Sequence, residues 1–282
     1  MPLTSSATAD AYARLTEVIP GLAITELAPG RPLPAGGGWA PATALAEGGA
    51  DLEAFLARDH TQVLRDHGRP GRPDVIATFG LHRYAWPVCL LFTVPWFLHR
   101  RVPRLPVTHV SYDRTAAGLD LGHLVVRTDS FACLPGDPAA ALPGARVVAG
   151  EEALRAEVRA AVAEHMEPVL AGFGPRMRRR GRALWGMATD EIVEGLWYVA
   201  GLIGEQPRAV RELEALLPGA TRPYAGAAGF RELTGPNGES LPTRDRVSCC
   251  MYYTLDAMDA CPTCPRTCEA KRVTKPLAAT AS

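Results

Sequence analysis

Apolar residues recur at three- and four-residue spacing in two parts of the N-terminal third, which is the pattern of amphipathic helices. The first covers about residues 9–18 and the second about residues 51–67. Gly68 and Pro70 follow the second pattern and predict where that helix ends. The apolar positions that share one side of the second helix are Leu52, Phe55, Leu56, Val63 and Leu64.

Three more helices are predicted after residue 150. The first covers about residues 151–174 and begins with two glutamates, which favour the positive end of a helix dipole. The second, over about residues 181–204, is apolar enough to be a central helix. Pro207 begins the third, and Pro218 ends it. The four-residue spacing of the first helix is carried by Leu154, Val158, Val162, Met166 and Leu170.

Short β-rich runs lie between these two groups of helices. The runs VTHVSYD and LGHLVVRTD, within residues 107–129, predict a hairpin whose loop is Thr115–Asp120. The runs FACL and ARVVAG predict further short strands. Helices, then short strands, then helices is the order of an α+β fold with a small antiparallel sheet. No internal repeat is visible.

Composition and charge limit the classes of partner. The 282 residues are 47% apolar and 21% charged, and 30 basic residues balance 30 acidic ones. Because the net charge is zero, we expect no nucleic-acid partner. The apolar run Tyr84–Leu98 holds two prolines and is too short for a spanning helix, so we expect no transmembrane segment. The first residues lack a signal-peptide pattern, and we therefore expect a cytoplasmic protein, in which thiols stay reduced.

Five of the seven cysteines lie within the last part of the chain, from Cys249 to Cys268. Such a cluster in a reducing compartment indicates metal or redox chemistry. Four nearby thiolates suit zinc or an iron–sulfur cluster. Cys261 and Cys264 form a CxxC pair typical of half a zinc site, whereas adjacent Cys249 and Cys250 do not easily reach one tetrahedral ion. The spacing moderately favours a binuclear cluster and leaves zinc open as an alternative.

The whole pattern, CC, ten residues, C, two residues, C, resembles the C-terminal [2Fe–2S] motif of the ferric-siderophore reductases, the FhuF family. The resemblance is strong over about residues 244–266 and only general upstream. Cys268 is outside the four-cysteine pattern. The positions that match the cysteine pattern are Cys249, Cys250, Cys261 and Cys264, and Arg246, Tyr252 or Tyr253, and Pro265 also look like the family.

The resemblance implies a one-electron reductase that converts siderophore-bound Fe(III) to Fe(II) in the cytoplasm. It implies that the four matching cysteines hold a [2Fe–2S] cluster and that no other catalytic residue is needed. Since the chain has neither a GxGxxG motif after a strand nor a P-loop, we expect electrons from an external donor such as a ferredoxin or a flavin reductase. The alternatives are a ferredoxin-like electron-transfer protein and a siderophore-binding protein with a structural metal site.

These inferences divide the chain into three parts. Residues 1–240 are predicted to be an α+β scaffold that docks the siderophore, residues 241–270 a cluster-binding segment packed on it, and residues 271–282 a flexible tail. Cys89 and Cys133 lie in apolar runs and are predicted to be core residues.

Other candidates carry weaker signals. The arginine-rich runs 176–182 and 99–104 are either solvated surface or docking patches for an acidic electron carrier or an anionic ferric complex. His109 and His123 could face each other across the predicted hairpin and line a ligand pocket, although exposed strand positions are the simpler interpretation.

Overall fold

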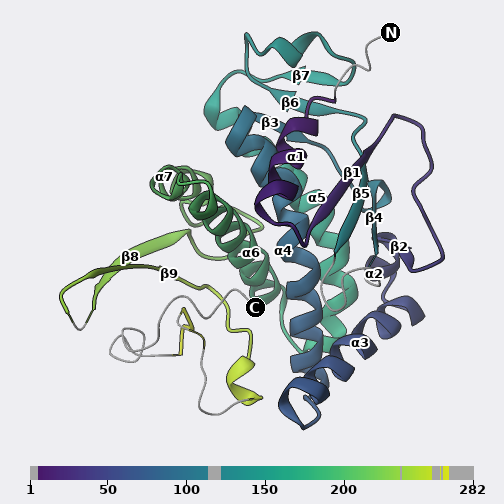
Figure 1. The fold of residues 1–282 in the computed structure, drawn as a ribbon, viewed down its shortest axis with the longest axis vertical. Coiled ribbons are helices and arrows are strands. Elements are labelled where there is room, and N and C mark those ends of the chain that lie inside the picture. The colour runs from purple at the N-terminus through teal and green to yellow at the C-terminus, as the bar shows by residue number, and fades with distance from the viewer. Residues whose placement is uncertain (1–5, 114–121, 236, 256–260, 262, 267–282) are drawn as a thin grey trace.

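Helices and three small sheets form the structure, a computed structural model that describes residues 6–113, 122–235, 237–255, 261 and 263–266 (Figure 1). The α+β class is therefore confirmed. The helices are α1 (Ala9–Val18), α2 (Thr43–Glu47), α3 (Ala50–His67), α4 (Pro73–His99), α5 (Glu151–Met177), α6 (Gly181–Leu202) and α7 (Gln206–Leu216). Short 3-10 turns are η1 (Val107–His109), η2 (Pro138–Ala141) and η3 (Tyr252–Thr254).

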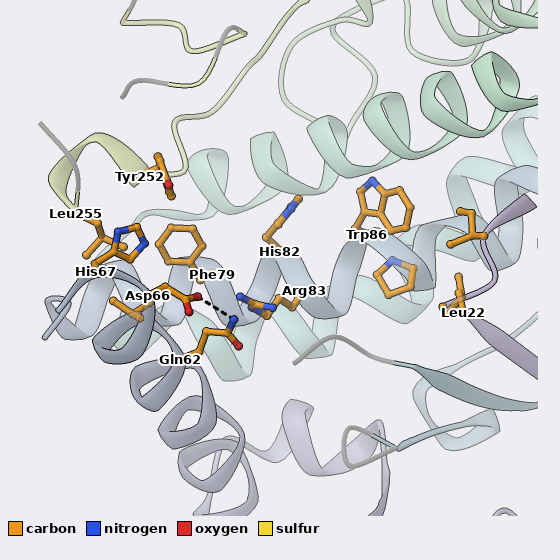
Figure 2. A pocket seen from close by; sticks show the side chains of 14 residues that line it. Leu22, Gln62, Asp66, His67, Phe79, His82, Arg83, Trp86, Tyr252 and Leu255 are labelled. Carbon is orange, nitrogen blue, oxygen red and sulfur yellow. Dashed lines mark hydrogen bonds between the residues drawn. The ribbon is translucent and has the colours of Figure 1, made fainter. Parts of the chain in front are cut away.

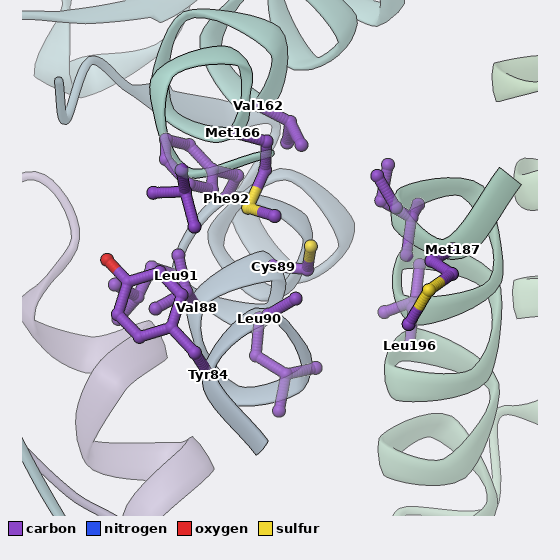
Figure 3. Packing of buried hydrophobic residues seen from close by; sticks show 14 of the residues in the cluster. Tyr84, Val88, Cys89, Leu90, Leu91, Phe92, Val162, Met166, Met187 and Leu196 are labelled. Carbon is purple, nitrogen blue, oxygen red and sulfur yellow. The ribbon is translucent and has the colours of Figure 1, made fainter. Parts of the chain in front are cut away.

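Helix α4 runs through the centre of the fold and packs against α5 on one side and α6 on another (Figures 1 and 3). The second half of α4 is buried on nearly every face, and its side chains there are accordingly almost all apolar. Tyr84, Leu91 and Phe92 have no exposed surface, and Cys89 lies among them. The predicted core role of Cys89 is thus confirmed, and burial raises the pKa of its thiol well above the ordinary value.

The apolar run predicted over Tyr84–Leu98 belongs to this longer helix, which contains both Pro87 and Pro95. By length and composition α4 could span a membrane, with a mean hydropathy of 1.3 in its most apolar window. However, 78% of that window is buried inside the fold. The burial of α4 against α5 and α6 therefore explains why its composition is so apolar.

The largest sheet has the strand order β1-β5-β4-β2. Strands β4 (Val110–Asp113) and β5 (His123–Arg127) are the predicted hairpin pair and are antiparallel. Their predicted connection, Thr115–Asp120, lies outside the described residues. Strand β1 (Ala23–Leu27) joins β5 in parallel and β2 (Trp39–Pro41) joins β4 in antiparallel fashion, so the sheet is mixed rather than wholly antiparallel.

Two smaller sheets complete the fold. Strands β3 (Arg101–Pro103), β6 (Phe131–Cys133) and β7 (Ala145–Val147) form the second sheet, and β6 and β7 are the two short strands predicted from FACL and ARVVAG. Cys133 is fully buried there, as predicted. Strands β8 (Gly229–Thr234) and β9 (Ser240–Asp245) form an antiparallel hairpin that leads to the cysteine segment and spans the predicted boundary at residue 240. The predicted tail, 271–282, lies outside the described residues.

Two expectations about single side chains are wrong. His109 lies in η1 before β4, whereas His123 pairs with Asp113 at the far end of that strand, so the two histidines do not face each other. His109 is 3.5 Å from Asp129, and His123 hydrogen-bonds with Thr25. Leu64 is 45% exposed, because it follows buried Val63 by one residue and therefore lies off the buried face of α3.

Candidate metal centre

The four predicted ligand cysteines come together as two pairs of thiols. The side chains of Cys250 and Cys261 hydrogen-bond with each other, and so do those of Cys249 and Cys264. Each pair joins one member of the adjacent cysteines to one member of the CxxC turn. That turn is closed by a hydrogen bond of 2.9 Å from the backbone N–H of Cys264 to the carbonyl of Cys261.

Two pairs of thiols fit a binuclear cluster better than a single metal ion. Within the described residues, no three histidine, cysteine, aspartate or glutamate side chains lie close enough together to hold one ion. A tetrahedral zinc site needs four donors around one centre, whereas a [2Fe–2S] cluster takes two thiolates at each of its two irons. The two pairs of thiols therefore fit a [2Fe–2S] cluster.

Positive charge and backbone N–H groups favour a thiolate at Cys250, whereas burial raises the pKa of Cys249. The backbone N–H of Met251 donates to Sγ of Cys249 at 3.4 Å. The bond from Cys261, the nearby Arg246 charge and the backbone N–H of Tyr252 together lower the pKa of Cys250 to about 5, against the opposing effect of burial. Such donors stabilise a charged sulfur and tune the potential of an iron–sulfur cluster. Arg246 thus has a position consistent with the predicted supporting role.

Asp190 on α6 anchors the chain immediately before the cysteines. Its carboxylate accepts hydrogen bonds of 2.8 Å from the backbone N–H groups of both Val247 and Ser248. The Ser248 hydroxyl donates a further bond of 2.6 Å to the same carboxylate. Asp190 is 1% exposed, so these bonds form away from water and fix the direction in which the chain enters Cys249.

Two arginines of the C-terminal segment compensate the acidic face of α6. Arg244 is 1% exposed and lies 3.3 Å from Asp190, and it also pairs with Glu194. Arg246 lies 3.8 Å from Asp190. Burial disfavours the charge of Glu194, but Arg244 and Arg246 outweigh burial and lower its pKa to about 2. The cysteine segment is therefore held to α6 by buried ion pairs as well as by hydrogen bonds.

A second buried acid, Glu191, connects α6 to α4. Its two carboxylate oxygens each lie 2.8 Å from Nδ1 of His82, and Glu191 has no exposed surface. Burial lowers the tendency of His82 to be charged, but the Glu191 charge and hydrogen bond outweigh burial and raise the pKa of His82. His82 is also close enough for its charge to help lower the pKa of Cys250.

The arginine run 176–182 lies beside the cysteine segment. Arg179 donates a hydrogen bond of 2.6 Å to the backbone carbonyl of Cys249. Arg176 pairs with Glu53 on α3, while Arg178, Arg180 and Arg182 are exposed. The second run is different, because each of its arginines is in an ion pair with a carboxylate. These pairs are Arg100 with Glu151 and Glu212, Arg101 with Asp137, and Arg104 with Glu164.

Sequence reasoning found the cysteines but missed the carboxylates that support them. A signal was present, since Asp190, Glu191 and Glu194 interrupt the apolar pattern of a helix predicted to be central. Charged residues are almost never fully buried without a partner, so acids in such a helix imply buried bases elsewhere in the chain. Arg244 and Arg246, which are two residues apart in the C-terminal segment, are those bases. Cys268 lies outside the described residues.

Comparison with known proteins identifies this segment. Residues 246–266 match the FhuF 2Fe-2S C-terminal domain, and the four paired cysteines all lie within the match. The chain therefore carries an FhuF-type domain, and the cofactor that this domain indicates is a [2Fe–2S] cluster. A search of curated proteins found no match to the chain. The match makes the chain an FhuF-like, siderophore-related iron–sulfur protein.

Proposed function

We propose that this protein is a ferric-siderophore reductase that acts in the cytoplasm, and that Cys249, Cys250, Cys261 and Cys264 hold its cluster. The observation that carries the proposal is the match of residues 246–266 to the FhuF 2Fe-2S C-terminal domain. When bound, a [2Fe–2S] cluster supplies one electron at a time, which is the number needed to convert Fe(III) to Fe(II).

Transfer of a single electron is enough to weaken the binding of iron by a siderophore. Siderophores hold Fe(III) through hard oxygen donors, and Fe(II) is larger and less charged. The same oxygen donors hold Fe(II) less strongly, so softer nitrogen or sulfur ligands compete for it. The role of this chain is to bind the ferric complex near the cysteine segment and to hold that segment in place through Asp190.

The electron donor is proposed to be an acidic protein, either a ferredoxin or a flavin reductase. The exposed arginines 178, 180 and 182 support this assignment, because they present positive charge next to the carbonyl of Cys249 that Arg179 binds. A basic patch attracts an acidic carrier and speeds its encounter. One electron from the donor would replace each electron passed to iron, so the overall exchange is balanced.

The size of the scaffold favours the reductase over a ferredoxin-like carrier. A carrier needs little more than the cysteine segment and its support, whereas here seven helices and three sheets precede Cys249 in the described residues. The alternative of a siderophore-binding protein with a structural metal shares the docking step and differs in the absence of electron transfer.

A single-turnover experiment tests the proposal. The purified protein is reduced anaerobically, freed of reductant and mixed with a ferric siderophore and an Fe(II) chelator, without any nucleotide. We expect one Fe(II) to be trapped for each cluster oxidised, as followed by visible absorption. Reoxidation of the cluster without Fe(II) formation, or no reaction at all, would overturn the reductase assignment.

A further inference from the structure

A cavity with a volume of about 760 Å³ lies between α3, α4, the turn that follows α1, and η3 (Figure 2). This volume is within the range of about 300–1,000 Å³ that small-molecule sites occupy. Its main wall is one face of α4, where Phe79, His82 and Trp86 recur at helical spacing. Tyr252 lies at one end beside Phe79, and Leu22 lies at the other beside Trp86 (Figure 2). The two aromatic ends of the wall are two helical turns apart, which is about 10 Å along the axis and suits an elongated ligand.

Gln62 of α3 gives this cavity an unsatisfied amide. Its side chain lines the cavity and is only 8% exposed. The Nε2 atom donates a hydrogen bond of 2.9 Å to Asp66, whereas Oε1 is buried and has no hydrogen-bond partner among the described residues. A buried acceptor without a partner costs free energy unless a bound molecule donates to it. The amide therefore offers a ligand one acceptor and the second N–H of its NH2 group.

The other polar side chains of the lining differ from Gln62 in their bonding. The ion pairs are Arg83 with Asp59 at 2.9 Å, Asp66 with Arg65 at 3.6 Å, and His82 with Glu191 at 2.8 Å. His67 instead packs edge-on against the ring of Tyr252, and its ring nitrogens can each form a hydrogen bond. The lining therefore offers a ligand mainly aromatic surface and hydrogen-bonding groups.

The cavity adjoins the cysteine segment through Tyr252. The Tyr252 ring packs edge-on against His67 of α3 and Phe79 of α4, with ring centroids 5.6 Å and 6.0 Å apart. Its backbone N–H donates to the sulfur of Cys250, two residues earlier in the chain. One residue therefore both lines the cavity and bonds a predicted cluster ligand, so a molecule in the cavity lies against the wall that carries Cys250.

The neighbouring metal centre limits the class of redox-active ligand. A [2Fe–2S] cluster takes up one electron at a time, whereas a nicotinamide passes two electrons together as a hydride. A flavin can pass its electrons singly. Its flat three-ring isoalloxazine stacks on aromatic side chains and carries an N–H between two carbonyls, which matches the acceptor and the donor of Gln62. We propose that the cavity binds the isoalloxazine ring of a reduced flavin, which delivers electrons to the cluster.

This route adds a small-molecule donor to the protein donor that the exposed arginines attract. A dihydroflavin gives up two electrons and two protons when it becomes oxidised flavin. Since the cluster holds one of these electrons at a time, each dihydroflavin reduces the cluster twice, and each reduced cluster converts one Fe(III) to Fe(II). The inference rests on the proposed function for the fate of the electrons, but flavin binding is measured without iron complexes.

The first experiment titrates lumiflavin, which is the isoalloxazine ring without a ribityl chain, with the oxidised, cluster-loaded protein. Stacking on Trp86 should quench its fluorescence with saturation. We expect 3-methyllumiflavin, which lacks the N–H, to bind about tenfold more weakly. Gln62→Met removes the amide at similar volume and should reduce this preference to about twofold or less. Riboflavin and flavin mononucleotide share the ring and should both bind, and the tighter of the two is the natural form.

Gly21 provides a second substitution, which fills the cavity without strain. It lines the cavity, and a Cβ added there meets no other atom within 4 Å. Its backbone does not have the positive φ that disfavours side chains. Gly21→Leu should weaken lumiflavin binding about tenfold or more, whereas Gly150→Leu should leave it within about twofold of the unchanged protein. Gly150 is the matched control, because it is equally open and is not among the residues that line the cavity.

The outcomes separate this inference from the reductase assignment. If the unchanged protein does not bind lumiflavin, if Gln62→Met retains the full preference, or if Gly21→Leu binds as tightly as the unchanged protein, the flavin inference is overturned even where ferric complexes are reduced. Binding of reduced lumiflavin without reduction of the cluster, followed by anaerobic stopped-flow absorption, would overturn it as well. If reduced lumiflavin does reduce the cluster while no ferric complex is reduced, the flavin inference stands and the reductase assignment falls. The variants are compared at equal cluster absorbance.

Discussion

The Asp190 carboxylate holds Ser248 through two hydrogen bonds, one from the backbone N–H at 2.8 Å and one from the hydroxyl at 2.6 Å. Ser248 immediately precedes the first of the paired cysteines. A buried acid on a core helix thus fixes the chain at the point where it enters the cysteine segment. This relationship connects the stability of the scaffold to the ability of the chain to assemble its metal centre.

Substitution of Asp190 should therefore affect both stability and cluster content. Asp190→Ala removes the acceptor for Val247 and Ser248 and one partner of buried Arg244. Breaking a buried charged pair costs about 3–5 kcal/mol, so we expect a comparable loss in the free energy of unfolding and a lower iron content per chain. Ser248→Ala removes a single hydroxyl and should cost only about 1 kcal/mol. Denaturant unfolding and iron analysis measure the two effects.

Glu214→Ala is the matched control for Asp190→Ala, because Glu214 is an exposed acid on α7. It should retain its iron and its stability. An Asp190→Ala protein that retained a full complement of iron would show that the buried acid does not position the cysteine segment.

Substitution of single cysteines tests the predicted ligand set. Each of Cys249→Ser, Cys250→Ser, Cys261→Ser and Cys264→Ser should lose or strongly weaken the cluster absorption, because a hydroxyl is a poor replacement for a thiolate on iron. Cys268→Ser should retain it. Cys133→Ala is a control at a buried cysteine of the second sheet and should also retain it. Loss of the cluster in Cys268→Ser, together with retention in one of the four, would mean that the ligand set is wrong.

The buried histidine of α5 predicts acid sensitivity of the scaffold. His165 has no exposed surface, donates from Nδ1 to the Leu105 carbonyl at 2.7 Å and accepts from the Tyr84 hydroxyl at Nε2. Burial lowers its pKa from 6.5 to about 4. Between these values the unfolded chain binds a proton that the folded chain does not. Stability should therefore fall as the pH drops through this window, by about 3 kcal/mol in total.

Denaturant unfolding at a series of pH values between about 7 and 4 measures this slope. His165→Gln should remove most of the His165 contribution to the slope, whereas His99→Gln, at an exposed position, should leave it unchanged. An equal slope in the unchanged protein and in His165→Gln would show that other groups cause the acid sensitivity.

The exposed arginines 178, 180 and 182 predict where an acidic electron donor docks. Replacing Arg178, Arg180 and Arg182 together by glutamine should slow reduction of the cluster by an acidic carrier about tenfold at low ionic strength. Added salt should slow the unchanged protein toward the rate of the variant, because salt screens exposed charges. Stopped-flow absorption follows the reduction. The paired arginines provide the control, since Arg104→Gln removes a charge that Glu164 already neutralises. A variant as fast as the unchanged protein at low salt would exclude this patch as the docking surface.

Local sequence patterns predicted much of the fold, and long-range pairing accounts for what they missed. Helices α1, α3, α5, α6 and α7 follow apolar periodicity or proline boundaries that are visible within a single segment, whereas only the apolar run Tyr84–Leu98 indicated α4. Strand β1 could not be found this way, because its partner β5 lies about a hundred residues later and the two pair in parallel. The exposed Leu64 has a different cause, since it lies beside the buried face of α3 that Val63 belongs to.

At the candidate site, spacing identified the cysteines because neighbouring residues of one segment carry the pattern. The support by Asp190, Glu191 and His82 was not visible, since it depends on which faces of α4 and α6 meet the C-terminal segment. Phe79, His82 and Trp86 share a helix face in the sequence, but only the docking of Tyr252 against that face encloses a site.

The most direct test of the central claim is the dependence of electron-transfer rate on the concentration of a ferric complex. The anaerobically reduced protein is mixed in a stopped-flow instrument with increasing ferric trihydroxamate, and oxidation of the cluster is followed by absorption. An enzyme with a docking site predicts that the rate saturates and that redox-inert gallium trihydroxamate inhibits competitively. A rate that increases linearly without saturation, is insensitive to gallium and is no faster than reduction by dithionite alone would contradict the reductase and leave a simple electron carrier.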